Sequence, residues 1–152
     1  MMQLINQPKG SAWCFACCVA MITKTTLEDV IGAISRKLFV PEKHPLRDNQ
    51  YLGLQDAIIY LAKHGYQYGS SHHYAKPVVI DCTDLTLTIG DALAIPAILT
   101  TVSNTFGDEH LHSVVWDPEE RVVLDPQHNT PQRLRKYKIR EWAIVSEFTA
   151  SI

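Results

Sequence analysis

The chain has 152 residues, 46% of them hydrophobic and 20% charged, and a formal net charge of −2. This balance is typical of one soluble globular domain, which we expect to span residues 1–152, and it excludes a global basic field that would recruit nucleic acid or an anionic membrane surface. No signal-peptide pattern opens the chain and no stretch approaches the roughly 18 to 20 apolar residues of a membrane span, so we expect a cytoplasmic protein without a membrane partner.

The first half of the chain is predicted to form three helices. Residues 14–23 are apolar nearly all round, which is typical of a helix buried on every side. Thr26 and Asp29 have the spacing of a capping box and predict a second helix that runs to about Lys37. A third helix is expected over residues 54–64.

The third predicted helix carries an apolar stripe at i, i+4 and i+7, formed by Leu54, Ile58 and Leu61. Gly65 follows where a C′ glycine ends a helix. Residues 39–51, which precede this helix, are polar and contain prolines, and we expect a loop there.

The second half of the chain has a β-branched composition, which predicts strands. The predicted strands are 77–81, 95–102, 111–117, 121–125 and 140–148, with a short helix near 88–93. A hairpin joins the third and fourth of these strands, and Pro118 occupies a favoured position in its turn. Helices followed by strands favour the α+β class over a parallel α/β sheet.

The cysteines allow two interpretations. Three of the four lie together near the N-terminus, unlike a secreted disulfide framework, and we expect them to be reduced. Cys14 and Cys17 have the spacing of a C-x-x-C redox centre, which needs a strand leading into it and a cis-proline loop that residues 95–98 could imitate. Residues 8–11 break any such strand and Cys18 adds a third thiol that invites mixed disulfides, so a thiol-disulfide oxidoreductase is the alternative.

The second interpretation makes Cys14 a nucleophile at the start of a helix, where the macrodipole and unpaired amides favour its thiolate. Such a thiol needs a histidine base and a third polar group that orients the imidazole. With a turn near 118–119, the hairpin register places His112 opposite Asp125. Gln7, seven residues before Cys14, is an amide positioned to assist the Cys14 backbone N–H as oxyanion donor.

Each of these assignments has an alternative. His110 lies on the same face of its strand as the predicted base and is a second candidate for that role. Asp125 precedes a proline, which is also typical of a turn that ends a strand, and Cys14 could be a buried structural thiol. Cys17 and Cys18 are predicted to be core residues.

One resemblance to a known family is carried by Gln7, Cys14 and residues 20–22, 53–66, 95–102, 112–116 and 124–127. In these residues the sequence resembles the papain-like cysteine peptidases, and within them the bacteriocin-processing peptidases that cut after double-glycine leaders, with their stand-alone relatives. Residues 15–16 depart from the Gly-Pro of transporter-linked members and are closer to the W-C-W-A type of some secreted bacterial effector peptidases. We therefore do not extend the double-glycine specificity to this chain.

The resemblance implies a papain-like fold, in which N-terminal helices pack on a C-terminal antiparallel sheet and the nucleophile starts a buried helix. It implies Cys14 as nucleophile, His112 as base, Asp125 as orienting group and Gln7 as oxyanion donor. The expected activity is that of a cysteine hydrolase, by default a thiol peptidase acting on a peptide or protein substrate, with no cofactor and no metal. Deamidation, transglutamination and isopeptide cleavage use the same residues, and a papain-like binding module without catalysis is a further alternative. Because the nucleophile lies close to Met1, we expect no propeptide.

Two other clusters lead to no site prediction. His72 and His73, taken with Cys82 or the N-terminal cysteines, match no zinc-ligand spacing, so we expect no metal. The run 133–140 carries five basic residues, a composition that can contact nucleic acid or an acidic partner. A solvated edge strand or loop explains this run as well, because basic side chains protect sheet edges, and we expect no nucleic-acid partner.

Overall fold

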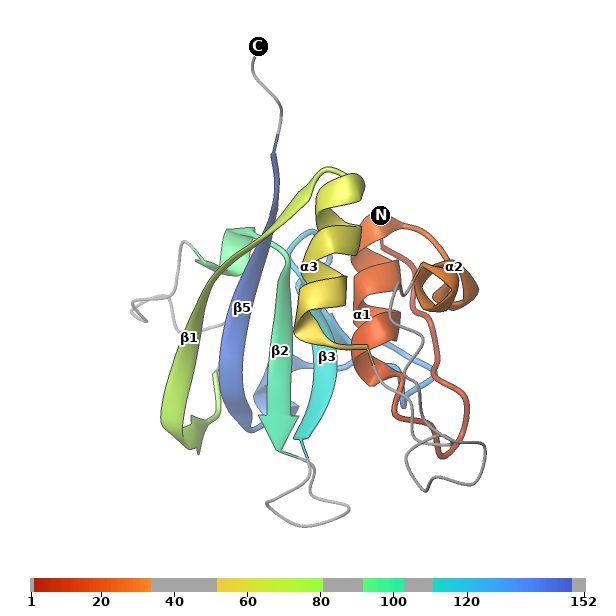
Figure 1. Cartoon of the computed structure of the whole chain (residues 1–152). Helices are drawn as coiled ribbons and strands as arrows, with labels where there is room; N and C mark the ends of the chain where they lie inside the picture. The colour runs from red at the N-terminus through yellow and green to blue at the C-terminus, as the bar shows by residue number, and fades with distance from the viewer. Residues whose placement is uncertain (1, 34–51, 81–91, 103–110, 149–152) are drawn as a thin grey trace.

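The computed structural model describes residues 2–33, 52–80, 92–102 and 111–148, which form α-helices, short 3₁₀ helices and a five-stranded sheet (Figure 1). In chain order the elements are α1 (Cys14–Thr23), α2 (Leu27–Gly32), α3 (Leu54–Lys63), β1 (Tyr66–Val78), η1 (Ala92–Ala94), β2 (Ala97–Val102), β3 (Leu111–Asp117), β4 (Val122–Leu124), η2 (Leu134–Lys136) and β5 (Ile139–Glu147). All neighbouring strands are antiparallel. The predicted α+β class is therefore confirmed.

The sheet has the strand order β1-β5-β2-β3-β4, so the last strand in the chain lies in its interior, between β1 and β2. β3 pairs with β2 along its whole length, from Val102↔Leu111 to Ala97↔Trp116. Its pairing with β4 is limited to the segment from Val115↔Leu124 to Asp117↔Val122. The first residues of β3, including His112, therefore lie beyond the ladder that β3 forms with β4.

Both faces of strands β2 to β5 are buried, and successive residues of these strands alternate between two cores. The core on the helix side takes its sheet residues from Ile98, Val115, Leu124 and Val145. The core on the opposite face takes intervening positions, among them Leu99, Val114, Trp116 and Val123, and includes Leu93 of η1 and Leu134 of η2. Burial on both faces explains why these strands read as nearly continuous apolar runs.

α1 is buried on all sides because its residues are apolar nearly all round, and its predicted bounds are confirmed. Every residue from Ala16 to Thr23 is buried, and the helix contacts β3, α2 and α3. Figure 1 shows the three helices gathered on one side of the sheet, with α2 outermost. The helix ends before Lys24, whose φ of 58° is left-handed. Among the described helices, none is both long and apolar enough to cross a membrane.

α2 begins as predicted. The Asp29 N–H donates to Thr26 Oγ1 at 3.1 Å, which caps the first turn of the helix. The helix ends at Gly32, with Ala33 as its C-cap. Residues 34–37 of the predicted helix and the predicted loop at 39–51 lie outside the described residues.

The face of α3 that packs on the core differs from the predicted stripe. Leu54 and Ile58 are 52% and 41% exposed, whereas Ala57, Tyr60 and Leu61 are buried. The polar end of Tyr60 explains this choice, because its hydroxyl lies 2.6 Å from a carboxylate oxygen of α2 and 2.9 Å from a threonine hydroxyl before α2. These hydrogen bonds hold the Tyr60 face of α3 toward the other helices, so the prediction that Leu54 and Ile58 face the core is wrong.

The prediction for β1 is also wrong. The structure has a strand over Tyr66–Val78, whereas the sequence predicts one at 77–81, and residue 81 lies outside the described part of the chain. β1 is an edge strand with mostly exposed or half-buried side chains and two register shifts, so it lacks the apolar pattern that identifies buried strands. β2 to β5 lie within two residues of their predicted bounds. Of the short helix predicted near 88–93, residues 88–91 lie outside the described residues, and η1 begins at Ala92.

Gly65 has a φ of 84°, and a Cβ added there would meet no atom within 4 Å. We expect Gly65→Ala to lower the free energy of unfolding by about 1 kcal/mol, because only backbone strain is introduced. Urea denaturation measures this loss. Gly32→Ala is the matched control: it also has open space but no left-handed φ, and alanine favours its helix. Equal losses in the two variants would contradict the strain argument.

Candidate functional site

Cys14 is the first residue of α1 and is partly exposed, whereas Cys17 and Cys18 are buried. The N-cap residue, Trp13, makes no side-chain hydrogen bond to the start of the helix. The first helical hydrogen bond runs from the Cys17 N–H to Trp13 O at 2.9 Å. Amides at this helix end have no capping side chain, so the positive end of the helix dipole acts on the Cys14 sulfur and favours its thiolate.

The predicted histidine and aspartate meet in a buried contact. His112 Nε2 lies 2.6 Å from Asp125 Oδ1, and the two residues are 8% and 2% exposed. The same carboxylate oxygen accepts the Gln127 N–H at 2.9 Å, and Oδ2 accepts the Tyr137 hydroxyl at 2.7 Å. Both oxygens of Asp125 are therefore hydrogen-bonded, as burial of a carboxylate requires.

The hairpin register that led to this pair is wrong by two residues. Val115 pairs with Leu124, two positions beyond its predicted partner, because the loop is residues 118–121 rather than a two-residue turn. Asp117 Oδ1 accepts the Glu119 N–H at 3.0 Å and stabilises this longer loop. A shift of two residues leaves every side chain on its predicted face. Asp125 follows the end of β4 and reaches His112 from the turn that begins there.

The start of β3 also supplies the contacts to Cys14. The pKa of the thiol is lowered by its interactions with the His112 ring and with the backbone and side chain of Ser113. Because Nε2 of His112 faces Asp125, Nδ1 is the ring nitrogen available to Cys14. The structure thus brings together three of the four predicted site residues.

The three side chains shift each other's pKa values in a consistent sense. Burial alone raises the pKa of Cys14, but the hydrogen bonds with His112 and Ser113 and the charge of His112 outweigh it and lower that pKa. Burial lowers the pKa of His112, yet Asp125 and Cys14 raise it to about 9. Asp125 has a lowered pKa because His112, Gln127 and Tyr137 oppose the effect of its burial. The arrangement favours an imidazolium between a carboxylate and a thiolate.

Gln7 is hydrogen-bonded to the residue after Asp125 but makes no hydrogen bond to Cys14. Its backbone N–H donates to Pro126 O at 3.0 Å, next to Asp125, and its side-chain Nε2 donates to Ser11 O at 2.7 Å. Gln7 Oε1 and Ser11 Oγ are both buried without a hydrogen-bond partner. The predicted oxyanion donor therefore lies on the segment that leads into α1, with its amide directed at that segment's own backbone.

Sequence reasoning missed two residues of the site. The sequence indicates only that Tyr137 lies within the basic run 133–140, whereas in the structure its hydroxyl donates to Asp125 Oδ2. Ser113 directly follows the predicted base and contacts the thiol. The one available signal for Tyr137 was an aromatic residue within a run of exposed basic residues. His110, the alternative base, lies outside the described residues.

The remaining sequence clusters do not form a metal site in the described part of the chain, where no group of three His, Cys, Asp or Glu side chains is arranged to hold a metal ion. His72 and His73 lie exposed on β1, and Cys82 is outside the described residues. In the basic run 133–140 the apolar Leu134 and Ile139 are buried in the core, which fixes the run to the sheet. The predicted core positions of Cys17 and Cys18 are confirmed, since both are 0% exposed.

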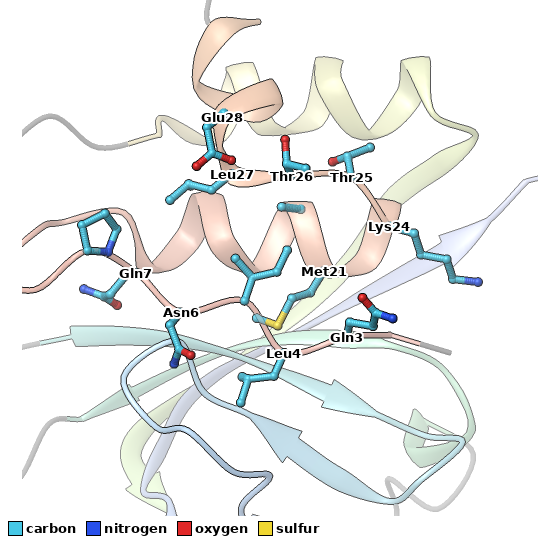
Figure 2. Close-up of a pocket in the computed structure, with 13 residues that line it drawn as sticks. Gln3, Leu4, Asn6, Gln7, Met21, Lys24, Thr25, Thr26, Leu27 and Glu28 are labelled. Atoms are coloured by element: carbon cyan, nitrogen blue, oxygen red, sulfur yellow. The ribbon is translucent and has the colours of Figure 1, made fainter.

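Two cavities lie near α1 without including Cys14 or His112. The larger, about 650 Å³, is lined by residues 3–8, by Ala20 and Met21 of α1 and by residues 24–28 (Figure 2). In Figure 2, Gln7 and Lys24 lie toward opposite ends of this cavity. The smaller, about 380 Å³, lies beside Ile22, Tyr66 and Asp117, among others. The convergence of Cys14, His112 and Asp125, and not a cavity, defines the candidate site.

We expect Asp125→Asn to lower the pKa of His112 from about 9 to 6.5 or below. The variant removes the charge that opposes the burial of the imidazolium, so the ring loses its proton at lower pH. NMR titration of the imidazole resonances measures this shift. His128→Gln is the control, because His128 is half-exposed and 3.7 Å from Asp125 Oδ2. A pKa that stays near 9 in Asp125→Asn would contradict the pairing.

We expect Tyr137→Phe to lower the free energy of unfolding by about 2 kcal/mol at neutral pH, because a hydrogen bond to a charged group is lost. Asp125 has a lowered pKa, so this contribution is present above the pKa of an unfolded aspartate and is lost as pH falls through the folded pKa. The difference from wild type should therefore shrink below about pH 4. Urea denaturation across pH measures it.

Tyr74→Phe is the control for Tyr137→Phe. Tyr74 is half-buried and packs against the His72 ring. Its hydroxyl makes no hydrogen bond to any of the described residues. Equal, pH-independent losses in the two variants would show that the Tyr137 hydroxyl does not support Asp125.

Comparison with known proteins adds no family assignment: no protein-family model matches the chain, and no curated protein matches it in sequence. A thiol at a helix start, a histidine of raised pKa and a hydrogen-bonded aspartate together form a possible nucleophile, proton carrier and orienting group.

Proposed function

We propose that this protein is a cysteine hydrolase, most simply a peptidase with a papain-like fold, in which Cys14 is the nucleophile. The observation that carries the proposal is the position of His112: its Nε2 lies 2.6 Å from Asp125 Oδ1, and its interaction with the Cys14 thiol raises the pKa of the imidazole and lowers that of the thiol. A nucleophilic thiol with a base that a third group orients is the arrangement that acyl transfer requires. The fold adds support, because the helix that carries the thiol packs on an antiparallel sheet that carries the base.

In the proposed reaction, the Cys14 thiolate attacks the carbonyl carbon of a peptide or protein substrate. The His112 imidazolium donates its proton to the leaving amine, and a water molecule then releases the acyl group with His112 as base. Asp125 keeps the imidazole oriented and stabilises its charge throughout. The backbone N–H of Cys14 is the first donor to the oxyanion.

Gln7 is the proposed second oxyanion donor. Its Nε2 carries two hydrogens, and the bond to Ser11 O uses one of them. The other is available to a substrate oxyanion at the start of α1. The buried, unpartnered Gln7 Oε1 leaves the amide incompletely satisfied in the free protein, which is compatible with a small reorientation when substrate binds.

A thiol-disulfide oxidoreductase has weaker support. A site of that kind needs a strand that leads into the first cysteine and a cis-proline loop. Residues 2–13 contain no strand, and no cis peptide bond occurs in the described ranges, which include Pro96. The Cys14 and Cys17 spacing alone supports this function.

The test is the pH dependence of iodoacetamide alkylation at Cys14, followed by mass spectrometry. We expect fast labelling with an apparent pKa below the ordinary thiol value of about 8.5, and a shift to higher pH in His112→Ala, because the pairing imidazolium is gone. Cys17→Ala should label like wild type. Slow labelling of Cys14, or equal labelling in His112→Ala, would refute the Cys-His pair.

Activity is tested with a peptide library and mass-spectrometric detection of cleaved, deamidated and cross-linked products. We expect cleavage by wild type, and a loss of at least about a hundredfold in Cys14→Ala and His112→Ala, because each removes a reacting group. Gln7→Ala should lose about tenfold to a hundredfold while Cys14 labelling is retained. Cleavage that persists in Cys14→Ala would overturn the proposal.

A further inference from the structure

The proposed reaction uses only one of the thiols in the first turns of α1. Cys17 is 0% exposed and has a free thiol, and it lies three residues after Cys14. The Cys17 N–H to Trp13 O hydrogen bond shows that this turn is regular α-helix. In such a turn the Cα atoms of residues i and i+3 are about 5 Å apart, inside the range that a disulfide spans.

We propose that Cys14 is a reversible oxidation site, at which hydrogen peroxide leads to a Cys14–Cys17 disulfide that blocks the nucleophile. The inference rests on the proposed function for its regulatory consequence, since the blocked residue is the proposed nucleophile. The bond itself depends only on a reactive Cys14 and a neighbouring thiol. It assigns a role to a buried thiol that hydrolysis does not need.

The chemistry balances in two steps. The Cys14 thiolate attacks one oxygen of hydrogen peroxide, the O–O bond breaks, and hydroxide leaves, so that Cys14 becomes a sulfenic acid and peroxide is reduced. The Cys17 sulfur then attacks the Cys14 sulfur and the S–O bond breaks. The Cys17 proton and the departing hydroxide form water. A dithiol reductant restores both thiols by attack on the Cys14 sulfur, the more accessible of the two.

The surroundings of the two sulfurs favour Cys14 as the oxidised group and Cys17 as the resolving thiol. Cys14 is partly exposed, and its interaction with His112 lowers its pKa and so stabilises its thiolate. Burial raises the pKa of Cys17 to about 12, so it stays a protonated thiol that peroxide does not attack directly.

Cys18 is the competing partner, at i+4. The charge of Asp125 helps to raise the pKa of Cys18, whereas the charge of Glu28 helps to raise that of Cys17, so the two thiols lie on different sides of α1. The i, i+3 pair is the spacing of helix-start redox disulfides, which favours Cys17. Cys18→Ala is therefore the matched control for Cys17→Ala, since both residues are buried in the same helix.

The experiment treats the full chain with a small excess of hydrogen peroxide and maps disulfides and sulfur oxidation states by mass spectrometry under non-reducing conditions. In wild type and Cys18→Ala we expect a Cys14–Cys17 disulfide, loss of Cys14 alkylation, and full recovery of alkylation after dithiothreitol. In Cys17→Ala we expect Cys14 to pass to sulfinic acid, with less than about a tenth of the alkylation recovered.

The direct detection of the bond in wild type keeps the test valid if a variant folds poorly. A Cys14–Cys18 bond, or recovery in Cys17→Ala equal to that in wild type, would overturn the assignment of Cys17. Formation of the Cys14–Cys17 bond in a protein that hydrolyses no peptide when reduced would support the modification site and refute the proposed function. Peptide cleavage that peroxide leaves unchanged would refute the regulation while the hydrolase remained.

Discussion

The buried contact between His112 and Asp125 is the constraint on which the candidate site depends. An isolated buried carboxylate is strongly disfavoured, so Asp125 must have partners wherever the fold places it. It finds them in three segments: His112 at the start of β3, the Gln127 N–H in the turn after β4, and Tyr137 shortly before β5. The same contact fixes the ring of His112 and leaves its other nitrogen for Cys14. Positioning and charge stabilisation therefore come from one interaction.

The two-sided core makes this contact possible. β3 and β4 carry buried residues on both faces, with Val115 and Leu124 toward the helices and Val114 and Val123 on the opposite side. A strand held from both faces cannot move without disturbing close packing. The first residues of β3 are not paired with β4, and Cys14 at the start of α1 interacts there with His112 and Ser113. The rigid strand therefore positions His112 beside both Cys14 and Asp125.

The first turn of α1 has two chemical properties that follow from the same geometry. The helix start favours a thiolate at Cys14, which makes it a good nucleophile toward carbonyl carbon and toward peroxide oxygen. The same helical repeat places Cys17 one turn away, in the interior. The reactive thiol of Cys14 and the buried thiol of Cys17 are therefore both consequences of the helical spacing of one short apolar segment.

The sequence by itself determined the features that depend on local pattern: the bounds of α1, the Thr26 cap, the strands β2 to β5 and the strand faces that bring His112 and Asp125 together. These are set by apolar periodicity, capping spacing and strand alternation, and alternation tolerated a register error of two residues because faces repeat with that period. Tertiary structure alone decided the packed face of α3, the exposed edge strand β1, and the contacts made by Tyr137, Ser113 and Gln7. Each of these depends on which distant group lies opposite, such as Tyr137 against Asp125, and no local pattern encodes that distance.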